Sequence, residues 1–308
     1  MADVTDAAFR RLIASKAKPD VTWTEFVSAD GLARAPEEGR KKLLLDLVYT
    51  ESERPIVAQF FTSKPEHMRQ AAALAKELGF DGIDINMGCP DKSIEKQGAG
   101  AAMMKNPALA REVIRAAKEG GAGLPVSVKT RVGYNKVELE TWLPEILKEA
   151  PAVVTVHART RKEMSKVAAR WELVKRAVEI RNEMKSETLI FGNGDALDLS
   201  DAREKVRETG CDGVMLGRAI FGNPWLFNEG YAPSLEERLE TLAEHIHLFD
   251  TILGHQKSFA IMKKHFKSYV HGFEGAVELR GLLMSAETAA EAVKIIQDNL
   301  PHLKSVVV

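Results

Sequence analysis

Two kinds of segment alternate along the chain up to about residue 230. Short apolar runs rich in β-branched residues are followed by longer runs in which apolar residues recur at helical spacing. This alternation is typical of βαβ units, which build a parallel sheet. Strands are expected at residues 21–27, 55–60, 82–88, 125–130, 152–158, 188–194 and 212–217, with crossover helices such as 64–79 and 106–121 between them.

The repeat favours a (β/α)8 TIM barrel, because its spacing is nearly regular and polar residues gather at the C-terminal ends of the strands. A doubly wound sheet would alternate in the same way. No Gly-x-Gly-x-x-Gly follows a strand, so no Rossmann site for a tightly held nicotinamide is expected. From about Ser234 onward the strand pattern ends and three or four helices follow. The expected domains are a barrel at 1–232 and a helical domain at 233–308.

The chain opens with a helix at 6–17, which Thr5 can cap, and no strand precedes it. An eight-stranded barrel would need one more strand before Met1, so we expect the first strand to be truncated. Strands 21–27 and 212–217 would then keep unpaired edges and lower the stability. A gap filled by another segment, such as 305–308, would argue against truncation.

Composition places the chain among soluble globular proteins, with 45% hydrophobic and 28% charged residues. It lacks an apolar run of about 18 residues and an export signal, and it has two cysteines, Cys89 and Cys211. These features predict a cytoplasmic protein without a membrane segment. The net charge of −1 means that a nucleic-acid partner would need a local basic patch.

Cys89 follows the strand 82–88 on a turn that contains Asn86 and Gly88, and a glycine-rich loop comes next. A thiol at a barrel mouth can give or take a proton when a neighbour adjusts its pKa. A lone cysteine is also a common packed small residue, which is the interpretation we give to Cys211.

Cationic side chains end two successive strands: Lys129, Arg131, His157, Arg159 and Arg161. Alternate residues of a strand point to the same side, so this cluster suits an anionic cofactor or a phosphodiester. Solvated surface charges are the alternative interpretation.

Two glycine-containing loops, 192–195 and 217–224, end the last two strands, where barrel enzymes commonly bind phosphate through backbone N–H groups. Their candidate ligands are Asn193, Gly194, Asp195, Gly217 and Arg218. Tight turns would also explain the glycines.

In the helical tail Lys263, Lys264 and Lys267 form a stripe that could hold phosphates, although a solvated helix face would look the same.

In combination these blocks resemble the tRNA-dihydrouridine synthase family over nearly the whole chain. The matching segments are 2–10, 24–32, 55–60, 82–104, 128–133 around Lys129, 156–161 around His157, 192–195, 210–227, 263–266 and 275–284. Two features depart from the family. Of the strand with which the family begins only Met1 remains, and in 164–171 Arg170 stands where relatives often carry an acidic residue.

The resemblance implies an FMN-dependent oxidoreductase acting on a carbon–carbon bond. NADPH or NADH reduces the flavin, which passes a hydride to carbon 6 of a uridine, and Cys89 protonates carbon 5. The implied flavin contacts are Gln59, Lys129 and His157, with Asn193, Gly194, Gly217 and Arg218 around the phosphate. Asn86 lies beside the uracil, and the candidate tRNA contacts are Arg131, Arg159, Arg161, Lys263, Lys264 and Lys267.

The expected partner is tRNA, held by the helical tail, and the protein is expected to be a monomer without a metal or a membrane. Two rival functions stay open: an FMN barrel that reduces a free pyrimidine, and a non-catalytic RNA-binding protein.

Overall fold

The computed structural model describes residues 3–302. Their contacts divide the chain into two compact units. The sheet unit consists of Val21–Leu47 and Arg54–Arg218, and the helical unit consists of Met1–Asp20, Val48–Glu53 and Ala219–Val308.

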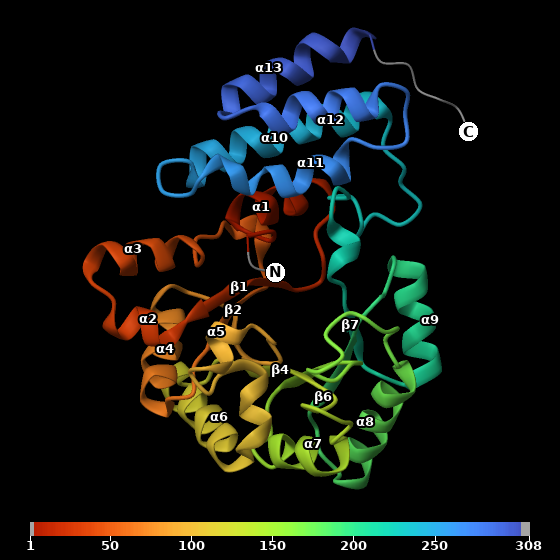
Figure 1. Ribbon diagram of the computed structural model, residues 1–308. Helices are drawn as coiled ribbons and strands as arrows, with labels where there is room; N and C mark the ends of the chain where they lie inside the picture. Colours follow the sequence, from red (N-terminus) through yellow and green to blue (C-terminus); the bar gives the residue numbers. More distant parts are fainter. Residues whose placement is uncertain (1–2, 303–308) are drawn as a thin grey trace. The chain divides into compact units, whose positions relative to one another are not determined.

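Within the described residues, the sheet unit contains seven parallel strands that pair in the order of the chain (Figure 1). Each strand begins within one residue of its expected start, so the expected strands are confirmed. Their bounds are Thr22–Ser28 (β1), Ile56–Phe61 (β2), Gly82–Met87 (β3), Val126–Arg131 (β4), Val153–His157 (β5), Leu189–Asn193 (β6) and Gly213–Met215 (β7).

Amphipathic helices cover the outer face of the curled sheet (Figure 1). The helices of this unit are α2 (Ala29–Arg34), α3 (Glu37–Leu45), α4 (Pro65–Glu77), α5 (Lys92–Glu95), α6 (Pro107–Gly121), α7 (Leu139–Leu147), α8 (Trp171–Glu183) and α9 (Leu199–Thr209). α4 packs on β2 and β3, and α6 packs on β3 and β4. Fully buried side chains such as Ile83 and Val128 fill the layer between them, each contributing about 1.5–3 kcal/mol.

The strands from β2 to β6 pair without a register shift. Gln59 pairs with Asp84 and Asp84 with Ser127, while Asn86 pairs with Lys129. Paired residues of neighbouring strands point to the same face of a sheet. One face therefore carries the apolar residues under the helices, and the other face carries these polar residues.

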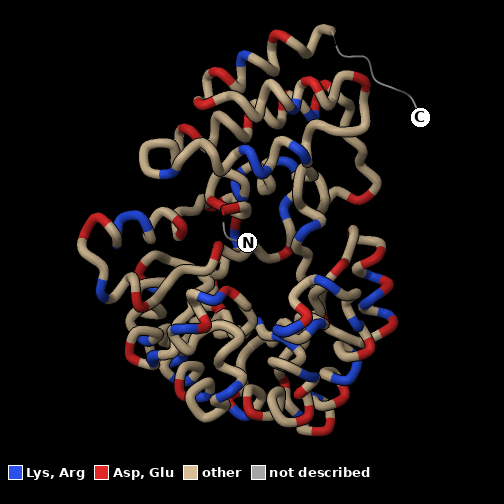
Figure 2. The backbone as a smooth tube through the Cα atoms, viewed as in Figure 1, with Lys and Arg blue, Asp and Glu red and all other residues tan. Residues whose placement is uncertain are grey.

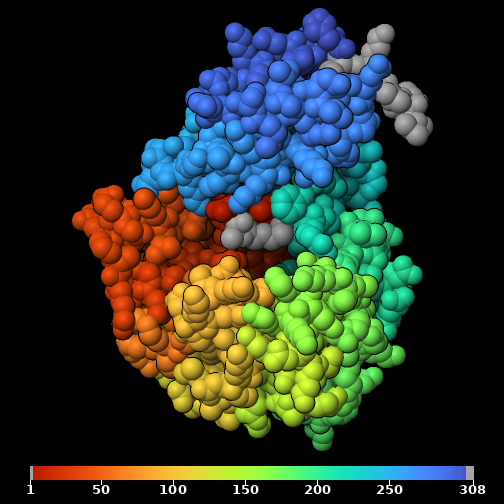
Figure 3. All heavy atoms as spheres, in the orientation of Figure 1, coloured from red at the N-terminus to blue at the C-terminus, as the bar shows by residue number. Residues whose placement is uncertain are grey.

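The helical unit contains α1 (Ala7–Lys16), α10 (Leu235–Leu253), α11 (Lys263–Tyr269), α12 (Ala276–Ser285) and α13 (Ala289–Asn299). α1 packs on α10, and α10 to α13 pack against one another (Figures 1 and 3). The expectation that Thr5 caps the first helix is wrong. Asp6 is the N-cap, because its carboxylate accepts a hydrogen bond from the backbone N–H of Phe9 at 2.9 Å.

The division into compact units differs from the expected one, which lies between residues 232 and 233. α1 and the segment 219–232 group with the C-terminal helices. Apolar side chains of α1, among them Phe9 and Leu12, are fully buried within the helical unit, and this packing decides its membership. A division of labour between a catalytic barrel and an RNA-binding tail stays a prediction.

Among the described residues, β1 pairs only with β2, and β7 pairs only with β6. The expected unpaired edges are present in this part of the chain. The expectation that 305–308 could fill the gap concerns residues outside the described range, as does Met1.

A buried ion pair joins α1 to the segment 48–53 within the helical unit. Arg10 donates to Glu53 at 2.9 Å, to the carbonyl of Thr5 at 2.9 Å and to the carbonyl of Val48 at 2.6 Å. The Arg10 and Glu53 side chains are 2% and 1% exposed. Removing one partner would leave the other charge buried without compensation.

We expect Glu53→Ala to lower the free energy of unfolding by about 3 kcal/mol, because the Arg10 guanidinium stays buried without its counter-charge. Urea denaturation measures the change. Lys41→Ala is the control, since the Lys41–Glu37 pair is exposed and contributes little. Equal losses from both variants would contradict this account of the pair.

Candidate active site

The polar face of the sheet unit gathers most of the residues that the sequence singled out. Because the register is in step, residues two apart on β2 to β6 line one face, and the loops after these strands extend it. The predicted residues in this unit are Gln59, Asn86, Cys89, Lys129, Arg131, His157, Arg159, Arg161, Asn193, Gly194, Asp195, Gly217 and Arg218.

Cys89 lies on a turn that Asn86 holds. The Asn86 side-chain oxygen accepts hydrogen bonds from the backbone N–H groups of Gly88 at 3.1 Å and Cys89 at 2.9 Å. The Cys89 carbonyl accepts from the N–H of Ala101 at 2.9 Å, which brings the following loop back to the turn. Gly100 permits this closure, because it has φ +59 and a Cβ there would lie 2.7 Å from the Cys89 oxygen.

The half-buried Cys89 side chain packs against an apolar cluster of Phe61, Ile94 and Ala99. Burial raises the pKa of the Cys89 thiol, and the charge of Asp91 acts in the same direction, whereas a hydrogen bond with the Asp91 backbone and the cations Arg131 and Lys129 lower it. The thiol is therefore protonated at neutral pH and can act as an acid.

Positive charge concentrates beside this turn. Lys129 donates to the side-chain oxygen of Asn193 at 3.2 Å, and burial together with Arg131 lowers its pKa to about 8. Burial and four cations lower the pKa of His157 to about 2, so this imidazole is neutral. Since Arg159 can only donate, its 3.2 Å contact makes His157 Nε2 an acceptor and puts the proton on Nδ1.

The loop after β6 is organised around Asp195. Its carboxylate accepts from Arg159, from Arg218 at 2.5 Å and from the N–H of Ala169 at 2.9 Å. The glycines at the end of β6 and in this loop serve packing, in addition to the close approach of a phosphate that the sequence predicts. A Cβ on Gly192 would lie 2.2 Å from the Trp171 ring, whose N–H donates to the Gly194 carbonyl at 2.9 Å.

The three arginines expected to contact tRNA all have partners inside the sheet unit. Arg131 donates to the carbonyls of Gly88 and Met164 at 2.8 and 3.0 Å, so it ties the Cys89 turn to the loop after β5. Arg161 binds Glu95 in α5 at 2.7 Å. Arg159, as described above, binds Asp195.

The lysine stripe belongs to the helical unit. Lys263 donates to the Met284 carbonyl in the last turn of α12 at 2.8 Å, and Lys264 forms an ion pair with Asp3 at 3.1 Å. Lys264 and Lys267 are exposed, whereas Lys263 is half-buried. Basic and acidic positions are interspersed along the helices of both units (Figure 2).

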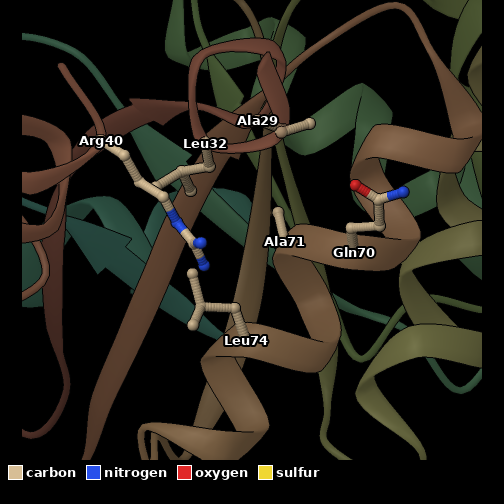
Figure 4. Close-up of a pocket in the computed structure, with 7 residues that line it drawn as sticks. Ala29, Leu32, Arg40, Gln70, Ala71 and Leu74 are labelled. Atoms are coloured by element: carbon tan, nitrogen blue, oxygen red, sulfur yellow. The ribbon is translucent and has the colours of Figure 1, made fainter. Parts of the chain in front are cut away.

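One pocket of about 180 Å³ lies among α2, α3 and α4, and none of the predicted residues lines it (Figure 4). Arg40 of α3 and Leu74 of α4 extend toward each other there. The pocket therefore contributes nothing to the cluster around Cys89.

Sequence reasoning missed two buried residues of the polar face, Asp84 and Ser127. Each lies two positions before a residue that was identified, Asn86 and Lys129, and a polar residue in phase within an apolar strand is the signal that could have revealed it. It also left Arg170 unexplained. Arg170 binds Glu163 with two hydrogen bonds of 2.8 Å, closing the loop after β5.

Comparison with known proteins assigns this arrangement to a family. A family model described as dihydrouridine synthase (Dus) matches residues 1–305. A probable tRNA-dihydrouridine synthase of Staphylococcus aureus (strain MRSA252) is 40% identical over 301 residues, covering 97% of this chain and 90% of the relative. The chain belongs to the dihydrouridine synthase family.

A second relative, the probable tRNA-dihydrouridine synthase 2 of Bacillus subtilis (strain 168), is also 40% identical, covering 97% of this chain and 91% of the relative. The family expected from the sequence is confirmed.

Among solved structures, the fold of this dihydrouridine synthase chain resembles old yellow enzyme-like barrels. Morphinone reductase in complex with tetrahydroNAD matches with a TM-score of 0.50 and 14% identity, covering 76% of this chain and 84% of that one. The old yellow enzyme homologue of Zymomonas mobilis matches with a TM-score of 0.51 and 12% identity, covering 75% and 86%. The expected barrel architecture is confirmed.

In the part of the chain that the structure describes, no helix is both long and apolar enough to cross a membrane.

We expect Cys89 to react with iodoacetamide at a rate that keeps rising beyond pH 9, because burial against the Phe61 cluster holds the thiol pKa above its ordinary value of 9.0. Mass spectrometry of the Cys211→Ala variant isolates the reaction of Cys89. A rate that levels off below about pH 8 would show an activated thiolate instead.

Proposed function

We propose that the protein reduces specific uridines of tRNA to 5,6-dihydrouridine, with a flavin as hydride donor and Cys89 as proton donor. The observation that carries the proposal is the Cys89 turn: a thiol kept protonated by burial lies beside a cluster of cations. Membership of the dihydrouridine synthase family supports the same reaction.

The charge distribution of the site fits FMN. Burial and repulsion from Arg131 lower the pKa of Lys129, and burial together with repulsion from Arg159 and Arg161 lowers the pKa of Arg131 to about 10. An anionic ligand would relieve this repulsion. We infer that FMN is held by Gln59, Lys129, His157, Asn193, Gly194, Asp195, Gly217 and Arg218.

Bound FMN, reduced by NADPH or NADH, would supply a hydride to carbon 6 of the uracil. The chain provides the other half of the reaction. Cys89 delivers its proton to carbon 5. Asn86 holds the turn that carries Cys89, and in this way it positions the base relative to the thiol. The Lys129 ammonium stabilises developing negative charge.

Asp195 keeps Arg159 and Arg218 oriented at the end of β6. We infer that these two cations attract phosphate, and that Lys264 and Lys267 of the exposed α11 face hold tRNA phosphates. The target base must leave its stack to reach Cys89, at a cost of a few kcal/mol that backbone contacts offset. We expect a cytoplasmic monomer.

A reductase of free pyrimidines is the second candidate, because the same flavin site and acid would serve it. Turnover of free uracil by the purified protein would favour that candidate. A non-catalytic RNA-binding protein is the third, and a colourless protein that takes up no FMN would favour it. Loss of dihydrouridine at defined positions, measured by sequencing tRNA from a deletion strain, would favour the proposed function.

We expect Cys89→Ala to keep bound flavin and its reduction by nicotinamide but to lose dihydrouridine formation by about a hundredfold or more, because the proton donor is absent. Single-turnover assays on unmodified tRNA measure the second step separately from the first. Cys211→Ala is the matched control, since Cys211 is buried in the sheet unit. Equal losses from both cysteines would indicate a stability effect.

We expect Lys267→Ala to reduce the salt dependence of tRNA binding by about one counterion, because an exposed lysine that holds one phosphate releases about one cation on binding. Filter binding across a salt series measures the slope. Lys263→Ala is the comparison, since Lys263 binds the Met284 carbonyl and should alter stability more than the slope. An unchanged salt slope of tRNA binding in Lys267→Ala would indicate that the lysine stripe is a solvated helix face that does not bind tRNA.

A further inference from the structure

A buried carboxylate lies below the Cys89 turn and has no part in the mechanism given so far. Asp84 of β3 is fully buried, and it accepts hydrogen bonds from Ser127 at 2.5 Å and from the side-chain N–H of Gln59 at 2.6 Å. Burial raises the pKa of Asp84 to about 6, so the group is ionised at neutral pH. An ionised carboxylate can only accept.

The hydrogen bonds continue from Asp84 to the turn in one direction. Because the Gln59 amide gives its N–H group to Asp84, its oxygen faces Asn86 and accepts from Asn86 Nδ2 at 3.1 Å. The Asn86 oxygen is then left for the backbone N–H groups of Gly88 and Cys89.

Both ends of this chain of bonds have a fixed polarity. The carboxylate at one end only accepts, and the two backbone N–H groups at the other end only donate. The two amides between them, Gln59 and Asn86, therefore have a single orientation in which every bond is made. Turning either amide would set N–H groups against N–H groups.

We propose that Asp84 is a positioning residue, which orients the Asn86 amide through Gln59 and thereby holds the Cys89 turn in place. The inference rests on the proposed role of Cys89 as the acid. Asp84 itself contacts neither the thiol nor the base in this account. Its effect on the reaction passes entirely through the orientation of two amides.

A conservative substitution separates this role from the charge of Asp84. In Asp84→Asn, the new side-chain oxygen can accept from Gln59, and its NH2 group can donate to Ser127. The Ser127 hydroxyl can then donate to the Ile83 carbonyl, which already lies 3.3 Å away. Each hydrogen bond between residue 84 and the Cys89 turn then keeps its donor and its acceptor. In Asp84→Leu the acceptor is lost, and Gln59 is free to turn.

The experiment compares these two variants as flavin-loaded full-length proteins, with Ser127→Ala as the matched control. Ser127→Ala removes the other partner of Asp84 and leaves the Gln59 bond in place. The first readout is the alkylation rate of Cys89 by iodoacetamide without tRNA. The second is kcat and KM for tRNA, with flavin content and thermal unfolding as checks on the fold.

We expect Asp84→Leu to lower kcat by about tenfold or more with little change in KM for tRNA, since the acid is misplaced while the tRNA contacts persist. Alkylation of its Cys89 should become faster, because a turn that is no longer held exposes the half-buried thiol. Asp84→Asn should restore both readouts to within about threefold of the wild type. Ser127→Ala should resemble Asp84→Asn.

Loss of activity in Asp84→Asn equal to that in Asp84→Leu would overturn the proposal, as would an unchanged alkylation rate in Asp84→Leu. If Asp84→Leu does not fold, Gln59→Leu breaks the same chain of bonds one step later and should expose Cys89 in the same way. The alkylation readout needs no substrate. Failure of wild-type turnover would therefore refute the proposed function without affecting the test of Asp84.

Discussion

The in-step register of the parallel strands is the constraint on which the site depends. With no shift between β2 and β6, every second residue of five strands reaches the same face of the sheet. A slip of one residue in β3 would turn Asp84 and Asn86 toward the helices and bring Ile83 and Ile85 to the polar face. Helix packing on those isoleucines thus holds the polar residues where they are.

Electrostatics then divides the polar face into two parts with different chemistry. Near β6 one carboxylate, Asp195, binds both Arg159 and Arg218, so one positive charge remains for a phosphate. Near β4 the charge of Asp84 raises the pKa of Lys129, but burial and Arg131 lower it more, and Lys129 keeps a depressed pKa beside a protonated thiol. A site with a cation next to an acid suits a reaction in which negative charge develops and a proton is then delivered.

Arginine side chains show how little residue type alone says about a role. Clustered at the ends of two strands, they predict contacts for phosphate. In the structure Arg131 and Arg161 bind a backbone carbonyl and a carboxylate that are distant in the sequence, and so join the loops around Cys89. A guanidinium with five donors can serve both purposes, so the tRNA contacts expected of these arginines stay a prediction.

The strands, the helical tail and the turn around Cys89 were predictable from the sequence, because they follow from local patterns: apolar periodicity, glycine in turns and polar residues at strand ends. The family resemblance was equally accessible, since it rests on contiguous blocks. Two features became visible in the three-dimensional structure alone: α1 packs with the C-terminal helices, and Asp84 is the acceptor at the end of a directed chain of hydrogen bonds that leads to Asn86. Such partners meet through strand pairing and helix packing across long stretches of chain, and no local pattern records which residues will be opposite one another.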